Sequence, residues 1–299
     1  MKKYICTVCG YVHEGDSAPE TCPVCKAPAS EFRLEAEEKK PLLGGKNSNA
    51  YIITYSVVMV VLVAAVLAFA ALKLQPIQNA NVELETKGAV LASIGQGAGA
   101  AEAADKNAYI NDEYNKYITD AFLVNEAGER VDGNAFEVLK NIKAEYDKPA
   151  AERLLPVFVS NVDGQVRYIL PVYGKGLWGP IWGYVALNSD WRTISGVVFD
   201  HKGETPGLGA EIAGEKFQSQ FEGKSIFSGD ELVAIAVLKG AGSSAGNPNA
   251  VDAVSGGTIT SRGVQQMLLD CLSGYKAYIE QQLAVAADAA NPLNAECHE

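Results

Sequence analysis

The stretch YIITYSVVMVVLVAAVLAFAAL, residues 51–72, divides the chain into parts of different kinds. Its twenty-two residues include no charged residue, proline or glycine, and a helix of about 20 apolar residues crosses the hydrocarbon core of a bilayer. A cleavable signal peptide would begin near Met1 and have a shorter apolar run. A buried helix of a globular protein would normally have a polar face. We therefore predict a single membrane-spanning helix over residues 51–73, in contact with membrane lipid.

The charges that flank this helix indicate its orientation. Lys39, Lys40 and Lys46 precede it, whereas Lys73 and then only Lys87 follow it. Because cytoplasmic flanks have the excess of lysine and arginine, the N-terminal part is predicted to be cytoplasmic. Closely spaced thiols also persist as thiolates in a reducing compartment. The part after the helix is then expected on the periplasmic side of the inner membrane.

Length and charge restrict the function classes. A chain of 299 residues with 48% apolar residues is long enough for one or two cores of ordinary size. Residues 1–73 include seven acidic and eight basic residues, whereas residues 74–299 include 29 acidic and 17 basic ones. Nucleic-acid binding depends on clustered lysine and arginine. No nucleic-acid partner is therefore expected.

Four of the six cysteines lie before the membrane helix, as the pairs Cys6-x-x-Cys9 and Cys22-x-x-Cys25. Each pair presents two thiolates on a tight turn, and two such pairs close a tetrahedral four-sulfur metal site. A domain this small has little core of its own and is expected to depend on the metal for folding. Structural zinc and redox-active iron both accept this geometry.

Residues 3–32 resemble the short rubredoxin-like module of rubrerythrins. The likeness includes the aromatic residues Tyr4, Tyr11 and Phe32, the Cys-Gly after the first pair and the Cys-Pro-x-Cys of the second. The resemblance implies one iron, held by the four cysteines and cycling by a single electron, with a structural zinc site as the alternative. His13 lies in this module and is expected to be a solvated loop residue, because four sulfurs already fill the site.

The part beyond the membrane helix is predicted to be an α+β domain with a mostly antiparallel sheet. It follows an Ala- and Gly-rich stretch, residues 90–105, whose composition is typical of a connector or a poorly ordered loop. Short apolar runs bounded by turn signals are expected to be strands. These runs are RLLPVFVS (153–160), RYILPVY (167–173), IWGYVALN (181–188), TISGVVFD (193–200) and ELVAIAVL (231–238). Helical patterns occur at residues 214–221 and 261–287.

The segment DAVSGGTITSRGV, residues 252–264, leads directly into the long predicted helix. Glycines and hydroxyls at a helix start leave backbone N–H groups free to meet an anion, which the helix dipole also favours. The segment is therefore a candidate phosphate site. The alternative is an ordinary N-cap, in which Thr260 or Ser261 satisfies the first amides of the helix.

The residues Ser255-Gly256-Gly257-Thr258-Ile-Thr260 resemble a known flavinylation motif, S-G-A-T-x-T. This motif occurs in the FMN-binding domain shared by the NqrC subunits of sodium-translocating NADH:quinone oxidoreductases and the RnfG subunits of Rnf complexes. The resemblance implies a phosphoester between the FMN phosphate and the hydroxyl of Thr260. Gly257 replaces the family's usual alanine, a loss of one methyl group that adds backbone freedom.

Two further stretches resemble the same family. DHKGETPGLG (200–209) is similar to its E-T-P-G-L-G loop, which lies against the flavin, and PVYGKGLWGPIWGYVAL (171–187) is similar to the G-K-G-L-W-G-P segment typical of NqrC. The resemblance thus runs from the membrane helix to about Tyr278. The further flavin-contacting residues that it implies are Gly176, Leu177, Trp178, Glu204, Thr205 and Leu208. Glu204 and Thr205 are expected to hydrogen-bond the polar edge of the flavin, and the apolar side chains either touch its ring or pack in the core.

The predicted organisation has six parts. They are a rubredoxin-like metal domain (1–38), a linker (39–50), the membrane helix (51–73), a connector (74–107), an FMN-binding domain (108–283) and a flexible tail (284–299). Cys271 lies in an apolar helical pattern and is expected to be buried and inert. Cys297 and His298, in the tail, are assigned no role.

The resemblance implies an electron-transfer subunit of a membrane Na+-translocating NADH:quinone oxidoreductase, whose covalent FMN relays electrons between redox centres of partner subunits. The chain has no glycine fingerprint for NADH, so NADH oxidation, quinone reduction and sodium transport are assigned to those partners. A periplasmic flavin transferase that uses FAD is expected to attach the flavin, and the iron is a possible extra entry or exit point for electrons. The alternatives are the RnfG subunit of an Rnf complex, a stand-alone flavin reductase, and a membrane-anchored zinc-ribbon protein without a redox centre.

Overall fold

The computed structural model describes residues 2–35 and 48–289, and the chain divides into two compact units, Met1–Gln75 and Pro76–Glu299. Lys39, Lys40 and Lys46, on which the predicted orientation depends, lie outside the described residues, as do Cys297 and His298. The boundaries of the six predicted parts remain predictions.

The N-terminal unit begins with a small antiparallel sheet. Strands β1 (Lys2–Cys6), β2 (Val12–Gly15) and β3 (Phe32–Leu34) pair in the order β2-β1-β3, and the 3-10 turn η1 (Ala29–Glu31) leads into β3. The buried hydrophobic cluster of this sheet consists of Cys6, Cys22 and Phe32. A core of this size cannot by itself offset the conformational entropy of some thirty ordered residues.

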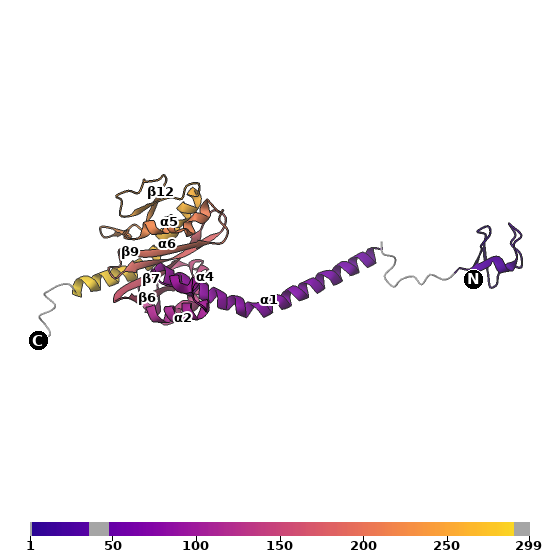
Figure 1. Ribbon diagram of the computed structural model, residues 1–299, viewed down its shortest axis with the longest axis horizontal. Coiled ribbons are helices and arrows are strands. Elements are labelled where there is room, and N and C mark those ends of the chain that lie inside the picture. Colours follow the sequence, from indigo (N-terminus) through magenta and orange to yellow (C-terminus); the bar gives the residue numbers. More distant parts are fainter. Residues whose placement is uncertain (1, 36–47, 290–299) are drawn as a thin grey trace. The chain divides into compact units, whose positions relative to one another are not determined.

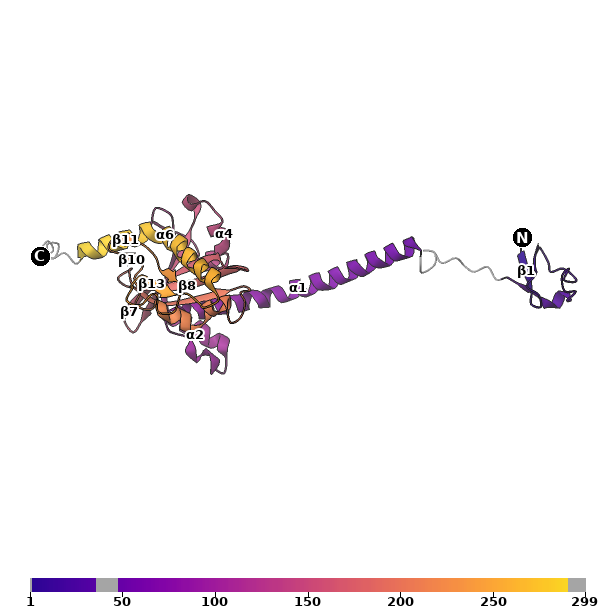
Figure 2. The same ribbon diagram turned by 90° about the horizontal axis from the view of Figure 1, so that it is seen from above.

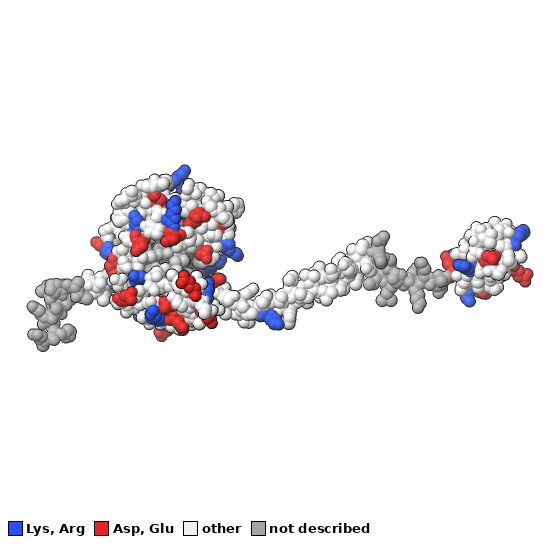
Figure 3. All heavy atoms as spheres, viewed as in Figure 1, with Lys and Arg blue, Asp and Glu red and all other residues white. Residues whose placement is uncertain are grey.

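Helix α1 (Asn49–Ser93) contains the predicted membrane span and continues well beyond it. Its most apolar 18-residue window has a mean hydropathy of 2.8 and is entirely unburied, as expected for a helix that contacts lipid. It is the one helix in the described chain that is long and apolar enough to cross a membrane. Figure 3 shows most of its exposed surface without charged side chains. Pro76 lies inside the helix, where the second unit begins.

The second unit is built on a six-stranded antiparallel sheet in the order β5-β4-β6-β7-β8-β9. Its strands are β4 (Ile118–Val124), β5 (Arg130–Val131), β6 (Leu155–Val162), β7 (Gln165–Lys175), β8 (Pro180–Asn188) and β9 (Ile194–His201). Four short strands form two separate pairs, β10 (Phe227–Ser228) with β11 (Glu231–Leu232) and β12 (Ala236–Leu238) with β13 (Ala250–Asp252). The α+β class and the antiparallel sheet are therefore confirmed.

Helices cover both faces of this sheet. They are α2 (Lys106–Tyr117), α3 (Ala135–Lys140), α4 (Ile142–Tyr146), α5 (Glu215–Gln218) and α6 (Thr258–Ala289), with 3-10 turns η2 (Ala98–Ala101), η3 (Ala150–Glu152), η4 (Gly209–Ala213) and η5 (Ser219–Phe221). Helix α6 packs along β7 (Figures 1 and 2). The end of α1, with α2 and α3, contributes to the core on the other face.

Neighbouring strand residues face opposite layers, as the period of two in a β-strand requires. In β7, Leu170 belongs to the core beneath α6, whereas Ile169 belongs to the core beneath α1. In β6, Val157 and Phe158 divide in the same way. The central strands are buried on both faces, which explains why their sequences are nearly continuous apolar runs.

The interpretation of residues 90–105 as a connector or poorly ordered loop is wrong for the first part of this stretch. Helix α1 continues to Ser93, and Val90, Leu91 and Ile94 are at most 2% exposed in the core of the second unit. The guanidinium of Arg167 on β7 also donates a 2.7 Å hydrogen bond to the carbonyl of Ile94. The end of the helix is therefore part of the domain.

The run ELVAIAVL was predicted to be one strand. It forms two short strands, β11 and β12, which are separated by residues 233–235. Ala234 has φ +54°, in the left-handed region, which interrupts an extended chain. The first part of the predicted flexible tail is also helical, because α6 continues to Ala289.

Candidate functional site

Three segments that are distant in sequence meet at the start of α6. They are the turn between β7 and β8, the loop that follows β9 and the glycine-rich residues before Thr258. Close approach is possible because glycines stand at the contacts. A methyl group at Gly263 would lie 2.5 Å from the carbonyl oxygen of Lys175, and one at Gly256 would lie 2.5 Å from Leu208 Cδ2. The three motifs of the sequence therefore form one site.

The side chain of Glu204 lies at the centre of this site. Its Oε2 accepts a 2.5 Å hydrogen bond from Thr260 Oγ1, and its Oε1 accepts a 2.8 Å hydrogen bond from the amide of Trp178. Glu204 is 4% exposed and Thr260 only 1%. Burial raises the pKa of Glu204, but the hydrogen bonds from Thr260, Trp178 and Gly179 outweigh this effect and hold the pKa below its ordinary value.

The first turn of α6 presents free backbone donors. Within the described residues, the amides of Thr258, Ile259 and Thr260 have no protein acceptor, whereas the amide of Ser261 already bonds to the carbonyl of Gly257 at 2.9 Å. Ser261 does not cap these amides, because its Oγ accepts instead from the amide of Val254. The N-cap alternative is thus not what the structure shows, and the helix start is suited to an anion.

A cleft of about 860 Å³ opens beside this helix start. The residues that line it include Ser255, Gly256 and Thr258 of the motif, together with Lys216 and Lys239. Thr258 is partly exposed, and Ser255 and Gly256 are exposed. The lining also includes Glu211 and Asp252, so the two lysines are balanced by two carboxylates. The feature that favours an anion here is the helix start.

Large apolar side chains are exposed on the segments that form the site. They are Leu177 (45% exposed), Trp178 (70%), Leu208 (43%) and Ile259 (59%). Folding would normally remove such side chains from water, so their exposure together suggests a surface for a flat apolar partner.

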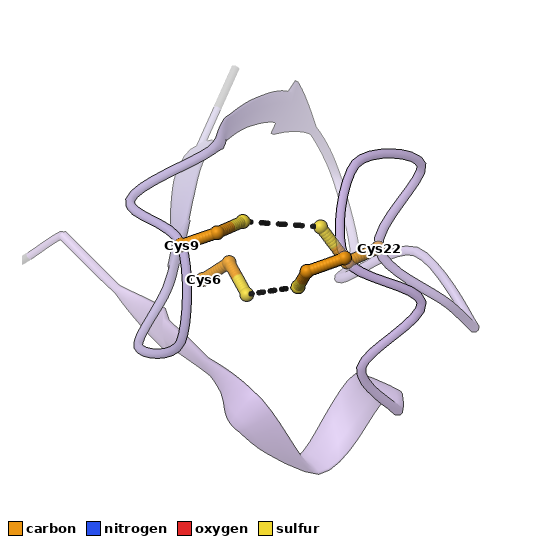
Figure 4. A group of neighbouring side chains, drawn as sticks. Cys6, Cys9 and Cys22 are labelled. Carbon is orange, nitrogen blue, oxygen red and sulfur yellow. Dashed lines mark hydrogen bonds between the residues drawn. The ribbon is translucent and has the colours of Figure 1, made fainter.

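The four N-terminal cysteines form a second site. Their sulfur atoms all lie within 4.8 Å of one another, and the pairs Cys6–Cys25 and Cys9–Cys22 are 3.6 Å apart (Figure 4). Metal–sulfur bonds of about 2.3 Å in a tetrahedron place sulfurs about 3.8 Å apart, so the cluster fits one such metal ion. Disulfides would need sulfurs about 2.05 Å apart, and these cysteines are free.

Backbone amides favour the thiolate form of one cysteine, Cys22, whereas hydrogen bonds among the neighbouring thiols raise the pKa of Cys9 and Cys25. Burial raises the pKa of the Cys22 thiol, but N–H groups of Cys25 and Val24 that point at its sulfur bring the pKa down to about 6. His13 is not part of the four-sulfur cluster, as expected, but it is a partly buried residue of strand β2 and not a loop residue.

Comparison with known families gives two matches in the expected order. Residues 4–33 match the rubredoxin-like domain of rubrerythrins, and residues 176–273 match the FMN-binding domain. The protein is also similar to NqrC of the Na(+)-translocating NADH-quinone reductase of Vibrio vulnificus, with 32% identity over 67% of this chain and 81% of the relative. This chain belongs to the NqrC family of Na+-translocating NADH-quinone reductases.

Other relatives support this membership. NqrC of Haemophilus ducreyi is 32% identical over 73% of this chain and 88% of its own length. The crystal structure of NqrC from Parabacteroides distasonis is 43% identical and covers 69% of this chain and 96% of that one, with a TM-score of 0.59. The NqrC structure from Shewanella oneidensis is 30% identical and covers 68% of this chain and 98% of that one, with a TM-score of 0.57.

Within this NqrC fold, the predicted flavin-contacting residues fall into different environments. Leu177, Trp178 and Leu208 are exposed around the site, so the core-packing alternative does not apply to them. Thr205 is exposed, and its carbonyl accepts from the amides of Leu208 and Ala210. Gly176 packs against the carboxylate of Glu204.

The carboxylate oxygens of Glu204 accept bonds from Thr260 and Trp178 within the chain. Each oxygen can accept a further bond, and the expected hydrogen bond from Glu204 to the edge of the flavin remains a prediction. The backbone freedom expected at Gly257 belongs instead to Gly256, which has φ +76°. A methyl group at Gly257 would lie 2.9 Å from the carbonyl oxygen of Leu208, so alanine would require this loop to shift.

Some residues of the site have no signal in the sequence. Lys216 and Lys239 belong to no motif that indicates a ligand, and only the fold brings them to the cleft. Ile259 stands at the unspecified position of the flavinylation motif, so the motif does not indicate its exposure. Gly209 lies in the E-T-P-G-L-G motif, but its role becomes visible only in space. A methyl group there would lie 2.5 Å from Thr260 Oγ1 and 2.6 Å from Glu204 Oε2.

We expect Gly209→Ala to break the Glu204–Thr260 hydrogen bond and to destabilise the domain by about 1–3 kcal/mol, because a buried carboxylate loses a donor. Gly203→Ala is the matched control in the same loop, since a methyl group there meets nothing within 4 Å. Its effect should stay within about 0.5 kcal/mol. Denaturant unfolding of the detergent-solubilised protein measures both, and equal stabilities would contradict the close packing at Gly209.

Proposed function

We propose that this protein is an electron-transfer subunit of a membrane NADH-quinone reductase, and that FMN held at the start of α6 relays electrons between redox centres of partner subunits. The observation that carries the proposal is the meeting of three motif segments at an open helix start in an FMN-binding domain. When bound, FMN supplies one-electron chemistry. The residues of the chain hold and orient it.

The chain offers suitable groups for each part of FMN. The free amides at the start of α6 suit the phosphate. Leu177, Trp178 and Leu208 are exposed and suit the apolar ring. Lys216 and Lys239 lie in the lining of the cleft, where they offset the charges of Glu211 and Asp252.

We propose Thr260 as the residue that is joined to the FMN phosphate. Among the hydroxyls of the S-G-G-T-I-T segment, that of Thr260 has a carboxylate acceptor, Glu204 Oε2 at 2.5 Å. A hydroxyl becomes a better nucleophile when a neighbouring base can take its proton. Thr260 is 1% exposed, so the helix start has to open when the flavin is attached. Thr258, which is partly exposed and lines the cleft, is the alternative outcome of the test.

The proposal includes the predicted location and partners. The N-terminal metal domain is placed in the cytoplasm and the FMN domain in the periplasm, one on each side of the inner membrane. A periplasmic flavin transferase then modifies the chain from FAD, and the other reductase subunits exchange electrons with the flavin. The cleft that opens beside the start of α6 is consistent with access by a second protein.

For the N-terminal site we propose iron as the metal, supported by the match to the rubredoxin-like domain. Val8 and Val24 each precede a cysteine and are 62% and 66% exposed, and Cys9 itself is exposed. Electrons can therefore reach the metal from a partner that contacts this surface. The site is proposed as an additional entry or exit point for electrons, with structural zinc as the alternative.

The relatives favour this function over the alternatives. Those that define the family are named as components of the Na+-translocating NADH-quinone reductase, not of an Rnf complex. The FMN-binding domain argues against a zinc-ribbon protein without a redox centre. A stand-alone flavin reductase would act without partner subunits, so co-purification of the complex from its own membrane distinguishes it.

Peptide mass spectrometry on the protein from its native membrane tests the flavin proposal. We expect a mass gain of one FMN less one water on the peptide that contains Thr258 and Thr260, with fragmentation assigning it to Thr260. Anaerobic addition of NADH to the intact complex should then bleach both the flavin and the ferric absorption. An unmodified peptide in a host that has the transferase would overturn the covalent flavin, and an iron that keeps its oxidation state would leave a docking or structural role.

A further inference from the structure

Glu204 is a buried carboxylate without a cationic side-chain partner among the lysines and arginines of the described residues. Its two oxygens are bound instead by donors from two other segments. One donor is the hydroxyl of Thr260 on α6, at 2.5 Å, and the other is the amide of Trp178 in the turn after β7, at 2.8 Å. One side chain therefore connects the three segments of the flavin site.

The surrounding backbone leaves little freedom to this carboxylate. A methyl group at Gly176 would lie 2.5 Å from Glu204 Oε1, and one at Gly209 would lie 2.6 Å from Oε2. Two glycines thus face its two oxygens, and the amide of Glu204 itself donates to His201 Nδ1 at 3.2 Å. The space matches a carboxylate held in one orientation, with Oε2 directed at the hydroxyl of Thr260.

Both neighbours of this carboxylate are donors, so the central group must be an acceptor at both oxygens. An ionised carboxylate meets this requirement, and hydrogen bonds to a charged acceptor are stronger than neutral ones. Glutamine has the same shape but cannot take up a proton. The arrangement therefore keeps a proton acceptor in contact with the one hydroxyl that the motif singles out.

The chemistry of attachment needs such an acceptor. The oxygen of Thr260 forms a bond to the phosphorus on the riboflavin side of FAD, the pyrophosphate P–O bond breaks, and AMP leaves with the bonding electron pair. The hydroxyl proton must be removed during this step. A base within about 2.6–3.2 Å of a hydroxyl is within reach of its proton, and Glu204 Oε2 lies 2.5 Å from Thr260 Oγ1.

We infer that Glu204 is the general base of its own chain's flavin attachment, taking the proton from Thr260 Oγ1 as that oxygen displaces AMP from FAD. This inference rests on the proposed function and deepens it. The products are the Thr260 phosphoester, AMP and a neutral Glu204. Proton uptake by Glu204 also removes the buried negative charge that would otherwise lie beside the new phosphate, which is costly in a low-dielectric site.

The test follows the modification reaction itself. Full-length protein from a host without the transferase is purified in detergent and incubated with purified flavin transferase and FAD, and intact-mass spectrometry measures the adduct over time. We expect Glu204→Gln to slow attachment by about 10²–10⁴-fold, the range that general-base catalysis contributes. Gly203→Ala is the matched control in the same loop, because its methyl group meets nothing within 4 Å, and it should be modified at the wild-type rate.

A second pair of variants separates the base from the packing around it. Glu204→Asp and Glu204→Asn shorten the side chain equally, but only aspartate can accept the proton. We expect the aspartate variant to be modified at least about tenfold faster than the asparagine variant. This comparison holds even where Glu204→Gln does not fold, and hydrogen exchange over residues 200–264 shows which variants are folded.

The outcomes separate the inference from the function on which it rests. Wild-type protein that takes no flavin on either threonine would overturn the proposed function itself. Flavin attached to Thr258 in the wild type would overturn the inference, since Glu204 does not contact that hydroxyl. A wild-type rate in folded Glu204→Gln, or equal rates in the aspartate and asparagine variants, would overturn it while leaving the covalent flavin in place.

Discussion

Removal of the metal unfolds the N-terminal domain and leaves the flavin domain intact. This result is expected because the buried hydrophobic cluster of that domain consists of Cys6, Cys22 and Phe32. Metal binding to four-ligand sites of this size contributes about 10–16 kcal/mol, which is the folding energy of such domains. Cys22→Ser, or treatment with a chelator, should therefore abolish hydrogen-exchange protection over residues 2–35 and leave residues 108–289 protected.

His13→Ala is the matched control for this prediction. His13 lies in the same module but outside the four-sulfur cluster, so its removal should preserve both the metal content and the protection. Hydrogen-exchange mass spectrometry of the full chain, with metal analysis of the same samples, provides both measurements. Persistent protection in metal-free Cys22→Ser would show that the small sheet is stable without metal.

The sequence predicts the features of this protein that depend on local pattern. The membrane span follows from an uninterrupted apolar run, the metal site from the spacing of four cysteines, and the central strands from short apolar segments between turns. A helix long and apolar enough to span a membrane, the cluster of four cysteines and the central strands all appear at or near the expected residues. Each depends on a few neighbouring residues and little on the rest of the fold.

Other features depend on tertiary packing. The average composition of a stretch does not show which of its residues are buried. Residues 90–105 are rich in Ala and Gly as a whole, yet Val90, Leu91 and Ile94 have the spacing of one helix face and lie in the core. The contact of Glu204 with Thr260 likewise joins residues that are distant in sequence. Neither the composition of a stretch nor a sequence motif shows this burial or this hydrogen bond.

The flavin motif does not distinguish its two threonines, Thr258 and Thr260, but helix geometry does. Residues two apart on an α-helix differ by about 200° in direction, so Thr258 and Thr260 face nearly opposite sides. Thr260 lies on the same stripe as Val264, Met267 and Cys271, all buried beneath α6. The apolar period of the helix therefore already indicates that Thr260 faces inward, although the motif alone does not.

Replacing Thr260 by alanine should eliminate the covalent flavin. The reason is chemical, because alanine has no hydroxyl to form the phosphoester, and the loss should be complete. Thr260→Ser keeps a hydroxyl beside Glu204 and should retain the adduct. Intact-mass measurement and in-gel flavin fluorescence of protein from the native host detect the difference, and unfolding of apoprotein should show both variants to be folded.

Thr258→Ala distinguishes the two threonines of the motif. Its hydroxyl has no carboxylate acceptor within the described residues, so the adduct should persist in this variant. Flavin that is lost in Thr258→Ala and retained in Thr260→Ala would place the bond on the partly exposed threonine that already lines the cleft. The Glu204–Thr260 hydrogen bond would then serve only to hold the helix start against the loop. Attachment at Thr260 instead requires the first turn of α6 to open, because its hydroxyl is 1% exposed. Among the motif hydroxyls, Thr260 is the one for which the described residues provide a carboxylate that can accept its proton.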